Sequence, residues 1–188
     1  MINTIVYLIG HYGVGKLTIA RHICGATGAR LFDNHLANNV IFSLIREDGS
    51  TPIPDAAWQI IMNIRRQALV AMADIARPEA SFVLTNALMD DDPLDRQAFD
   101  EVIAVAQKRR AVFVPVVLSA TDAAHAARIP SLERESRLKM TDVEGAARVR
   151  AGRALLRIDH PNRLDLETTT VPPEQAAQQI IHHAERLR

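Results

Sequence analysis

The stretch GHYGVGKLT, residues 10–18, decides the fold expected for this chain. It follows a nearly continuous apolar run at residues 2–9, which is typical of a strand buried on both faces of a parallel sheet. From Lys16 the apolar residues recur at helical spacing as far as Gly28, a residue suited to end a helix. A strand, a glycine-rich turn and a helix in direct succession give the G-x-x-x-x-G-K pattern the context in which it binds phosphate.

The glycine-rich turn is expected to hold the phosphates of a nucleotide. Its glycines allow backbone conformations that turn successive N–H groups inward, and the helix N-terminus adds positive potential. A dinucleotide-binding loop is the nearest alternative, but it would need glycine at Thr18 and would leave the charge of Lys16 without a purpose. The residues expected to bind nucleotide here are Gly10, His11, Tyr12, Gly13, Val14, Gly15, Lys16, Leu17 and Thr18.

Further along the chain, apolar segments of strand length alternate with helical stretches. This alternation predicts an α/β fold of three layers, with a parallel sheet of about five strands between helices. Pro115 lies inside one apolar segment and is expected at a bulge or strand end, because it cannot donate to a ladder. A chain of 188 residues, 48% of them hydrophobic, suits a single domain over residues 1–188. The later strands are expected at 29–33, 81–88, 111–119 and 163–168.

Composition narrows the possible partners. The 22 basic residues balance the 22 acidic ones, which disfavours a general nucleic-acid or membrane-surface role. Cys24 is the only cysteine, so an internal disulfide is excluded and a reducing compartment is favoured. The longest apolar run is too short to cross a bilayer, and the first residues lack the pattern of a signal peptide. We therefore expect a cytoplasmic protein without nucleic-acid or membrane partners.

Two segments carry a resemblance to a known family. IVYLIGHYGVGKLTIARHI at residues 5–23 has the G-x-x-G-x-G-K-x-T pattern, and LFDNH at residues 31–35 ends a strand with a carboxylate. On these residues the chain resembles the shikimate kinase and nucleoside-monophosphate kinase branch of P-loop proteins. The resemblance implies a three-layer P-loop fold, ATP and Mg²⁺ as cofactors, and Asp33 facing a small-molecule phosphoacceptor.

The same resemblance extends, with less specific motifs, through the rest of the chain. Helices at 35–47 and 56–76, joined by a proline-rich loop at 48–55, would form an acceptor-binding insert at about 34–80. An arginine-rich segment at about 130–150 would form a lid, although an amphipathic helix pair with paired charges would have the same composition. In this resemblance Arg128 and Asn162, the latter in the turn at 159–163, would contact the nucleotide.

The chain departs from the family pattern at two positions. Leu17 stands where a hydroxyl ordinarily binds Mg²⁺, so Thr18 or water would take that place. His35 stands where shikimate kinases carry a second aspartate, which makes shikimate itself a poor candidate. Each acceptor-side residue also has a structural alternative: Asp33 as a helix cap, His35 as a packed side chain, and Asn86 as part of a strand-end turn.

These observations predict an ATP-dependent phosphotransferase that moves the γ-phosphoryl group to a hydroxyl or a phosphate of a small molecule. The alternative is a nucleotide-binding module or switch with little or no catalysis, which the two departures and the amide at Asn86 would favour. The oligomeric state is left open. The expected catalytic residues are Lys16, Asp33, Arg134 and Arg137, the expected substrate-binding residues are Asp33, His35 and Asn86, and the expected metal ligands are Thr18 and Asp33.

Overall fold

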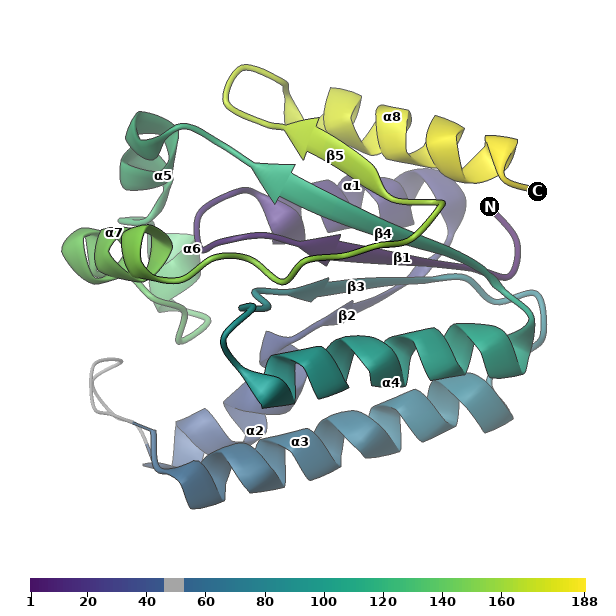
Figure 1. Ribbon diagram of the computed structural model, residues 1–188, viewed down its shortest axis with the longest axis horizontal. Coiled ribbons are helices and arrows are strands. Elements are labelled where there is room, and N and C mark those ends of the chain that lie inside the picture. The colour runs from purple at the N-terminus through teal and green to yellow at the C-terminus, as the bar shows by residue number, and fades with distance from the viewer. Residues whose placement is uncertain (46–52) are drawn as a thin grey trace.

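A parallel five-stranded sheet forms the centre of the molecule (Figure 1), as the sequence predicts. The computed structural model describes residues 1–45 and 53–188. The strand order is β2-β3-β1-β4-β5, and each neighbouring pair runs parallel. The strand before the glycine-rich loop is therefore the central one. The strands are β1 (Thr4–Ile9), β2 (Arg30–Asp33), β3 (Phe82–Asn86), β4 (Val112–Ser119) and β5 (Leu164–Glu167).

Helices cover both faces of this sheet, which gives three layers (Figure 1). Alternate residues of β1 point to opposite faces: Tyr7 packs in the cluster that contains α3 and α4, and Leu8 packs in the cluster that contains α1 and α8. All six residues of β1 are buried, which explains its continuous apolar sequence. The covering helices are α1 (Lys16–Thr27), α3 (Asp55–Val70), which continues into the π-helical turn η1 (Ala71–Ile75), α4 (Pro93–Arg109) and α8 (Pro173–Arg186).

The expected insert between β2 and β3 contains two helices, α2 (His35–Ile45) and α3, which pack against each other. Residues 48–52 of the expected proline-rich loop lie outside the described residues. The arginine-rich segment holds two separate helices with a loop at 136–142 between them. These are the single turn α6 (Leu132–Glu135) and α7 (Val143–Gly152), and they follow α5 (Asp122–Arg128).

Pro115 lies inside a regular strand, so the expectation of a bulge or strand end is wrong. The register of β4 against β1 runs through the pair Tyr7 and Pro115 without interruption. On the other side of β4, pairing with β5 begins only at Val116. The carbonyl of Phe113, two residues earlier, accepts a hydrogen bond from Asn162 on that same side. Pro115 thus lies before the point where β4 begins to pair with β5, so its lack of an N–H costs no hydrogen bond between the strands.

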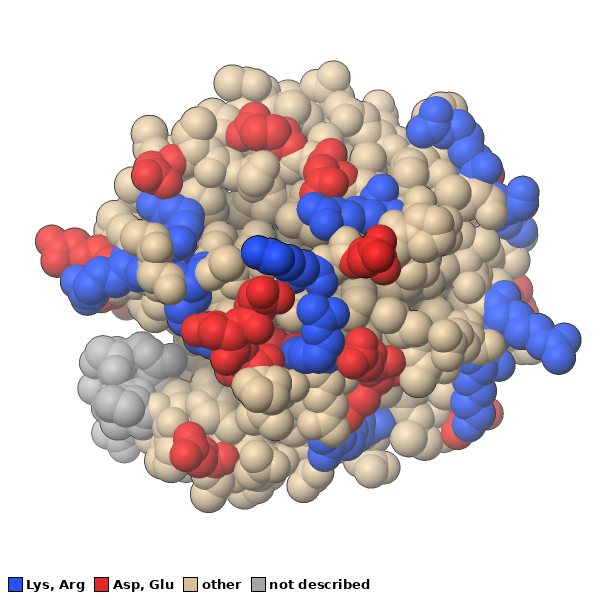
Figure 2. Space-filling view, viewed as in Figure 1, with Lys and Arg blue, Asp and Glu red and all other residues tan. Residues whose placement is uncertain are grey.

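Figure 2 shows basic and acidic side chains next to one another at the centre and left of this face, whereas mostly basic ones lie along the right-hand edge. The chain as a whole has equal numbers of both kinds. Within residues 1–45 and 53–188, no helix has the length and apolar character needed to cross a membrane.

Candidate nucleotide and acceptor site

The glycine-rich loop between β1 and α1 has a backbone that other residues adopt only with strain. Gly13 and Gly15 have φ of 80° and 95°, in the left-handed region. Gly10 needs its small size for a different reason: a Cβ there would lie 2.7 Å from the carbonyl oxygen of Leu118 in β4. Gly13 and Gly15 thus have the kind of backbone conformation that the sequence predicts for this loop, whereas Gly10 is needed for its small size.

Lys16 begins α1 and its side chain folds back over the loop. Its Nζ donates to the carbonyl oxygens of Gly10 at 2.6 Å and His11 at 2.9 Å. Burial, together with the positive charges of Lys139 and Arg134, lowers the pKa of Lys16 to about 7. An anion in the cleft would reverse this effect, because a nearby negative charge favours the ammonium form.

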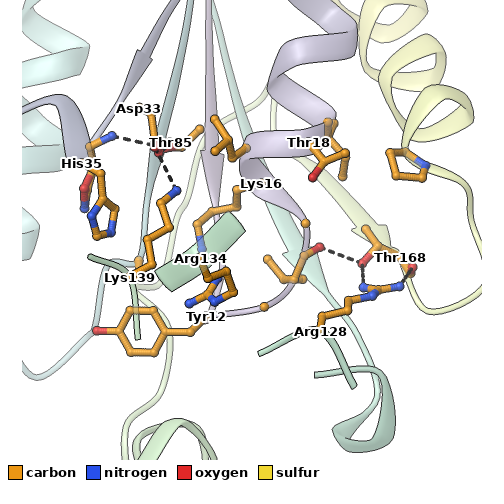
Figure 3. A pocket seen from close by; sticks show the side chains of 18 of the residues that line it. Tyr12, Lys16, Thr18, Asp33, His35, Thr85, Arg128, Arg134, Lys139 and Thr168 are labelled. Carbon is orange, nitrogen blue, oxygen red and sulfur yellow. Dashed lines mark hydrogen bonds and ion pairs between the residues drawn. The ribbon is translucent and has the colours of Figure 1, made fainter. Parts of the chain in front are cut away.

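A cleft of about 460 Å³ opens above this loop, at the carboxyl edge of the sheet (Figure 3). It is the place where open α/β sheets bind ligands. The structure brings most of the predicted site residues to this one cleft, but neither Gly10 nor His11 nor Asn162 is among its lining. The predicted residues that line it are Tyr12, Gly13, Val14, Gly15, Lys16, Leu17, Thr18, Asp33, His35, Asn86, Arg128, Arg134 and Arg137.

Asp33 is the last residue of β2, and its buried side chain lines this cleft. Lys139 Nζ lies 2.9 Å from Oδ2, and the Thr85 hydroxyl donates a short hydrogen bond to Oδ1. The carboxylate therefore does not cap α2. Burial opposes ionisation of Asp33, but the Lys139 ammonium and the Thr85 hydroxyl outweigh it, so its pKa lies below the ordinary value. At neutral pH the cleft contains one ionised carboxylate at this position.

The two other predicted acceptor-side residues are neutral. His35 lies with Nδ1 3.2 Å from Asn39 Oδ1, and burial, together with the charge of Lys139, lowers its pKa to about 4. Asn86 Oδ1 accepts hydrogen bonds from Asn34 Nδ2 and from Ala87 N, both at 2.9 Å, and its Nδ2 donates to Tyr7 Oη at 3.2 Å. The amide of Asn86 thus holds the end of β3, in agreement with the structural alternative for this residue.

Three arginines reach the cleft from the segment after β4. Arg128 donates through Nη2 to the carbonyl oxygens of Thr168 at 2.8 Å and Thr169 at 3.2 Å. Arg134 Nε donates to the carbonyl oxygen of Met140 at 2.9 Å, a bond that closes the loop after α6. The backbone carbonyl of Arg137 accepts from Asn39 Nδ2 at 3.0 Å, and this contact joins the arginine-rich segment to α2.

The structure also identifies site residues that the sequence analysis does not assign. Lys139 and Thr85 contact Asp33 directly. Thr168, at the end of β5, donates to the carbonyl oxygen of Val14 in the loop at 3.0 Å. The signals in the sequence for these residues are weak. Thr85 is one threonine near the end of β3, Lys139 is one of seven basic residues within 128–153, and Thr168 begins the stretch TTTVPP at residues 168–173. The segment after β5 also lines the cleft with Val171 and Pro173.

Asn162 is placed wrongly by the sequence analysis. Its Nδ2 donates to the carbonyl oxygen of Phe113 at 2.9 Å, and its own carbonyl lies 3.0 Å from His183 Nε2. Phe113 is level with Ile5 in the sheet register, near the start of β1. The turn at 159–163 therefore sits at the amino edge of the sheet, whereas the glycine-rich loop lies at the carboxyl edge.

Comparison with solved structures supports this assignment of the fold. No protein-family model matches the sequence, and no curated protein matches it either. A sugar kinase from Janibacter sp. is similar over 97% of this chain and 95% of its own, with TM-score 0.61 and 16% identity. An APS kinase from Mycobacterium tuberculosis, in complex with AMPPNP and APS, is similar over 98% of both chains, with TM-score 0.60 and 16% identity. A shikimate kinase from Acinetobacter baumannii, in complex with shikimate, is similar over 95% of this chain and 91% of its own, with TM-score 0.53 and 16% identity.

The chain has the fold of the P-loop small-molecule kinases. The P-loop is the GHYGVGKLT segment, and the sheet order places β2, with Asp33 at its end, on the far side of β3 from the P-loop strand. The cleft thus has two parts. One lies over the P-loop and the segment after β5, and the other lies beside Asp33 and His35.

The P-loop fold implies a magnesium ion, and the donor set fits it in part. The Thr18 hydroxyl lines the cleft and offers one oxygen, while Leu17 offers none. Among the described residues that line the cleft, Asp33 is the only carboxylate. Its pair with Lys139 disfavours it as a direct ligand, because an ammonium and a metal ion compete for the same oxygens. Among the described residues, no group of three or more His, Cys, Asp or Glu is placed to hold a metal. Mg²⁺ bound with few protein ligands, through phosphates and water, suits such a site.

Proposed function

We propose that the chain is an ATP-dependent kinase that transfers the γ-phosphoryl group to a hydroxyl group of a small molecule. The observation that carries this proposal is the ionised carboxylate of Asp33 in the same cleft as the P-loop lysine. A carboxylate beside the acceptor favours a hydroxyl over a phosphate, because a phosphate is already ionised and would be repelled. The similar structures of a sugar kinase, an APS kinase and a shikimate kinase support this chemistry.

In this proposal the two parts of the cleft bind the two substrates. Lys16 and the backbone N–H groups of the P-loop hold the β- and γ-phosphates. Arg128 and the segment at 168–173 contact the remainder of the nucleotide. Thr18 would contribute one oxygen to a magnesium ion, which would neutralise charge on the phosphates. The insert at about 34–80 supplies the acceptor side through Asp33 and the neutral His35.

The transfer step needs a base and a compensating positive charge. As the acceptor oxygen forms its bond to the γ-phosphorus, the bond from that phosphorus to the bridging oxygen breaks, and the electron pair leaves with ADP. The proton of the acceptor hydroxyl passes to the Asp33 carboxylate. Arg134 and Arg137, on the proposed lid at about 130–150, stabilise the charge that develops on the transferred group. Closure of this lid excludes water from the reaction.

A nucleotide-binding module with little catalysis is the second candidate. Leu17 in place of a hydroxyl favours it, as does the amide of Asn86, which is fully used in holding the end of β3. In a module, the carboxylate of Asp33 would have only a structural role as the partner of Lys139. The two candidates differ in whether bound ATP is consumed in the presence of an acceptor.

The experiment that separates them measures ADP release with a panel of sugars, polyols and other small hydroxyl compounds. We expect one class of compound to stimulate release, and we expect Asp33→Asn to reduce the stimulated rate by about a hundredfold or more. Lys16→Ala should abolish it. Lys108→Met is the matched control, because Lys108 forms an exposed ion pair with Asp74 outside the cleft. Tight ATP binding without turnover on any acceptor would instead establish the module.

The role of Thr18 has its own test. Thr18→Ala should weaken ATP binding in the presence of Mg²⁺ and leave binding in EDTA unchanged, as measured by calorimetry. Equal magnesium dependence in the variant and the parent protein would show that water and phosphates alone hold the ion.

A further inference from the structure

The ion pair between Lys139 and Asp33 crosses the cleft from the proposed lid to the sheet (Figure 3). The side chains of Asp33 and Lys139 are only 7% and 11% exposed, so the pair is shielded from solvent. Both carboxylate oxygens are engaged, Oδ1 by the Thr85 hydroxyl and Oδ2 by Lys139. In this arrangement each oxygen already accepts one hydrogen bond, and the Lys139 ammonium stands between Oδ2 and the cleft.

The two partners of Asp33 differ in how easily they can leave. Thr85 is the register partner of Asp33 on the neighbouring strand, so its position is determined by the sheet. Lys139 is on the loop at 136–142 after α6 and is not part of a strand. In this loop the carbonyl of Arg137 accepts a hydrogen bond from Asn39 of α2, and Arg134 Nε donates to the carbonyl of Met140. An acceptor hydroxyl that takes the place of one partner would therefore displace Lys139 more easily than Thr85.

The backbone of the loop at 136–142, which we call the lid loop, holds Lys139 in position beside Asp33. Leu138, directly before it, adopts φ of 52°, a left-handed conformation that is unfavourable for leucine. Hydrogen bonds hold the turn on both sides: Lys139 N donates to the carbonyl of Arg134, and Arg134 Nε donates to the carbonyl of Met140. A strained turn that is held in this way points to a function for the side chain at its apex.

We propose that Lys139 is a positioning residue that occupies Asp33 until an acceptor hydroxyl displaces it, and that this prevents transfer of the phosphoryl group to water. The inference rests on the proposed kinase function. In the suppressed reaction, a water oxygen would form the bond to the γ-phosphorus while the bond to the bridging oxygen breaks. ADP would leave with the electron pair, and the water proton would pass to Asp33. While Lys139 holds the carboxylate, the ammonium occupies Oδ2 and disfavours transfer of that proton to Asp33.

The test measures ATP hydrolysis without any acceptor at pH 8, because a high pH favours the ionised form of Asp33. We expect Lys139→Met to raise this hydrolysis by about tenfold or more, because a freed base acts on water. Lys139→Arg should keep hydrolysis low, since it keeps the positive charge. The double variant Asp33→Asn/Lys139→Met should lose the increase, and Lys108→Met, an exposed lysine outside the cleft, should behave as the parent protein.

Binding of a non-hydrolysable ATP analogue, measured by calorimetry, separates the possible failures. If Lys139→Met binds the analogue but hydrolyses ATP no faster than the parent protein, the inference is wrong and the proposed kinase function stands. An increase that persists in the double variant would also overturn the inference, because Asp33 would not be the base. If the parent protein does not bind the analogue, the proposed function and the inference fail together.

A second measurement does not depend on the folding of Lys139→Met. Asp33→Asn removes the partner of Lys139 while leaving the lysine in place. Amide hydrogen exchange over residues 131–142 should then be several-fold faster than in the parent protein, because the lid loop loses its buried contact. Unchanged exchange in this segment would show that the ion pair does not hold the lid, and would overturn the inference.

Discussion

Replacement of Gly10 by alanine gives a strong test of the P-loop geometry. The added Cβ would lie 2.7 Å from the carbonyl oxygen of Leu118 and 2.9 Å from Val14 Cγ1, whereas an ordinary contact begins near 3.4 Å. One of these neighbours is the backbone of β4, which β1 and β5 hold on its two sides. The clash can therefore be relieved only by moving the P-loop or a central strand.

The size of the effect follows from the packing around Gly10. Overpacking of a well-filled interior costs about 1–3 kcal/mol, and the backbone contact places Gly10→Ala at the upper end, about 3 kcal/mol. Gly25 provides the matched control, because a Cβ there meets nothing within 4 Å and the residue lies within α1. Gly25→Ala should stabilise the protein by about 0.5–1 kcal/mol through helix propensity. The two variants make the same chemical change with opposite expected signs.

The measurement is urea unfolding of both variants and the parent protein, followed by circular dichroism, with midpoint and slope compared. Gly10→Ala should also weaken ATP binding in calorimetry, because the displaced loop no longer presents its N–H groups correctly. If Gly10→Ala unfolds at the same urea concentration as Gly25→Ala, the close approach of the P-loop to β4 is wrong.

Three other substitutions test the remainder of the site and the fold. Thr85→Val removes the hydroxyl that helps to lower the pKa of Asp33, so this pKa should rise. The acid limb of the pH profile of kcat/KM for the acceptor should therefore move to higher pH. If the acid limb does not move, Asp33 is not the base. Arg128→Ala removes the charged group that holds the carbonyls of Thr168 and Thr169 beside the P-loop. ATP affinity, measured by calorimetry, should fall by about tenfold, since hydrogen bonds to charged groups contribute about 1.5–3 kcal/mol. Equal affinity of the variant and the parent protein would show that Arg128 does not contribute to nucleotide binding. Burial raises the pKa of Asp95 from 3.8 to about 6, so its contribution to stability is fully present below pH 3.8 and is lost as the pH rises through about 6. The gap in unfolding free energy between Asp95→Asn and the parent protein should therefore change across this window, and a constant gap would contradict the shifted pKa.

Features formed by neighbouring residues in the chain were predictable from the sequence. The P-loop, the strand before it and the helix after it lie within residues 4–27, and each has a local signal: apolar continuity, glycine at the positive-φ positions, and helical periodicity. Asp33 was predictable as a site residue because it ends the next strand, and the ends of parallel strands meet at one edge of a sheet. Its structural alternative, a helix cap, was also compatible with the sequence, although its place at a strand end beside the glycine-rich loop favoured the site.

Features that join distant segments were not predictable in this way. Lys139 and Asp33 are 106 positions apart, and nothing in the arginine-rich segment distinguishes Lys139 from its basic neighbours. Asn162 was assigned to the nucleotide although its turn precedes β5, at the amino edge of the sheet. The segment that does line the cleft, residues 168–173, follows β5 at the carboxyl edge.

The sequence alone determined the class of fold, the phosphate-binding loop and the carboxylate at the end of the second strand, because these depend on short-range backbone preferences and on burial patterns within single elements. The tertiary structure alone decided the state of that carboxylate. Its protonation and its freedom to accept a proton depend on Thr85 and Lys139, which approach it from a neighbouring strand and from the lid loop. Electrostatic interactions act through space, and only the packing of the elements sets the distances between these groups.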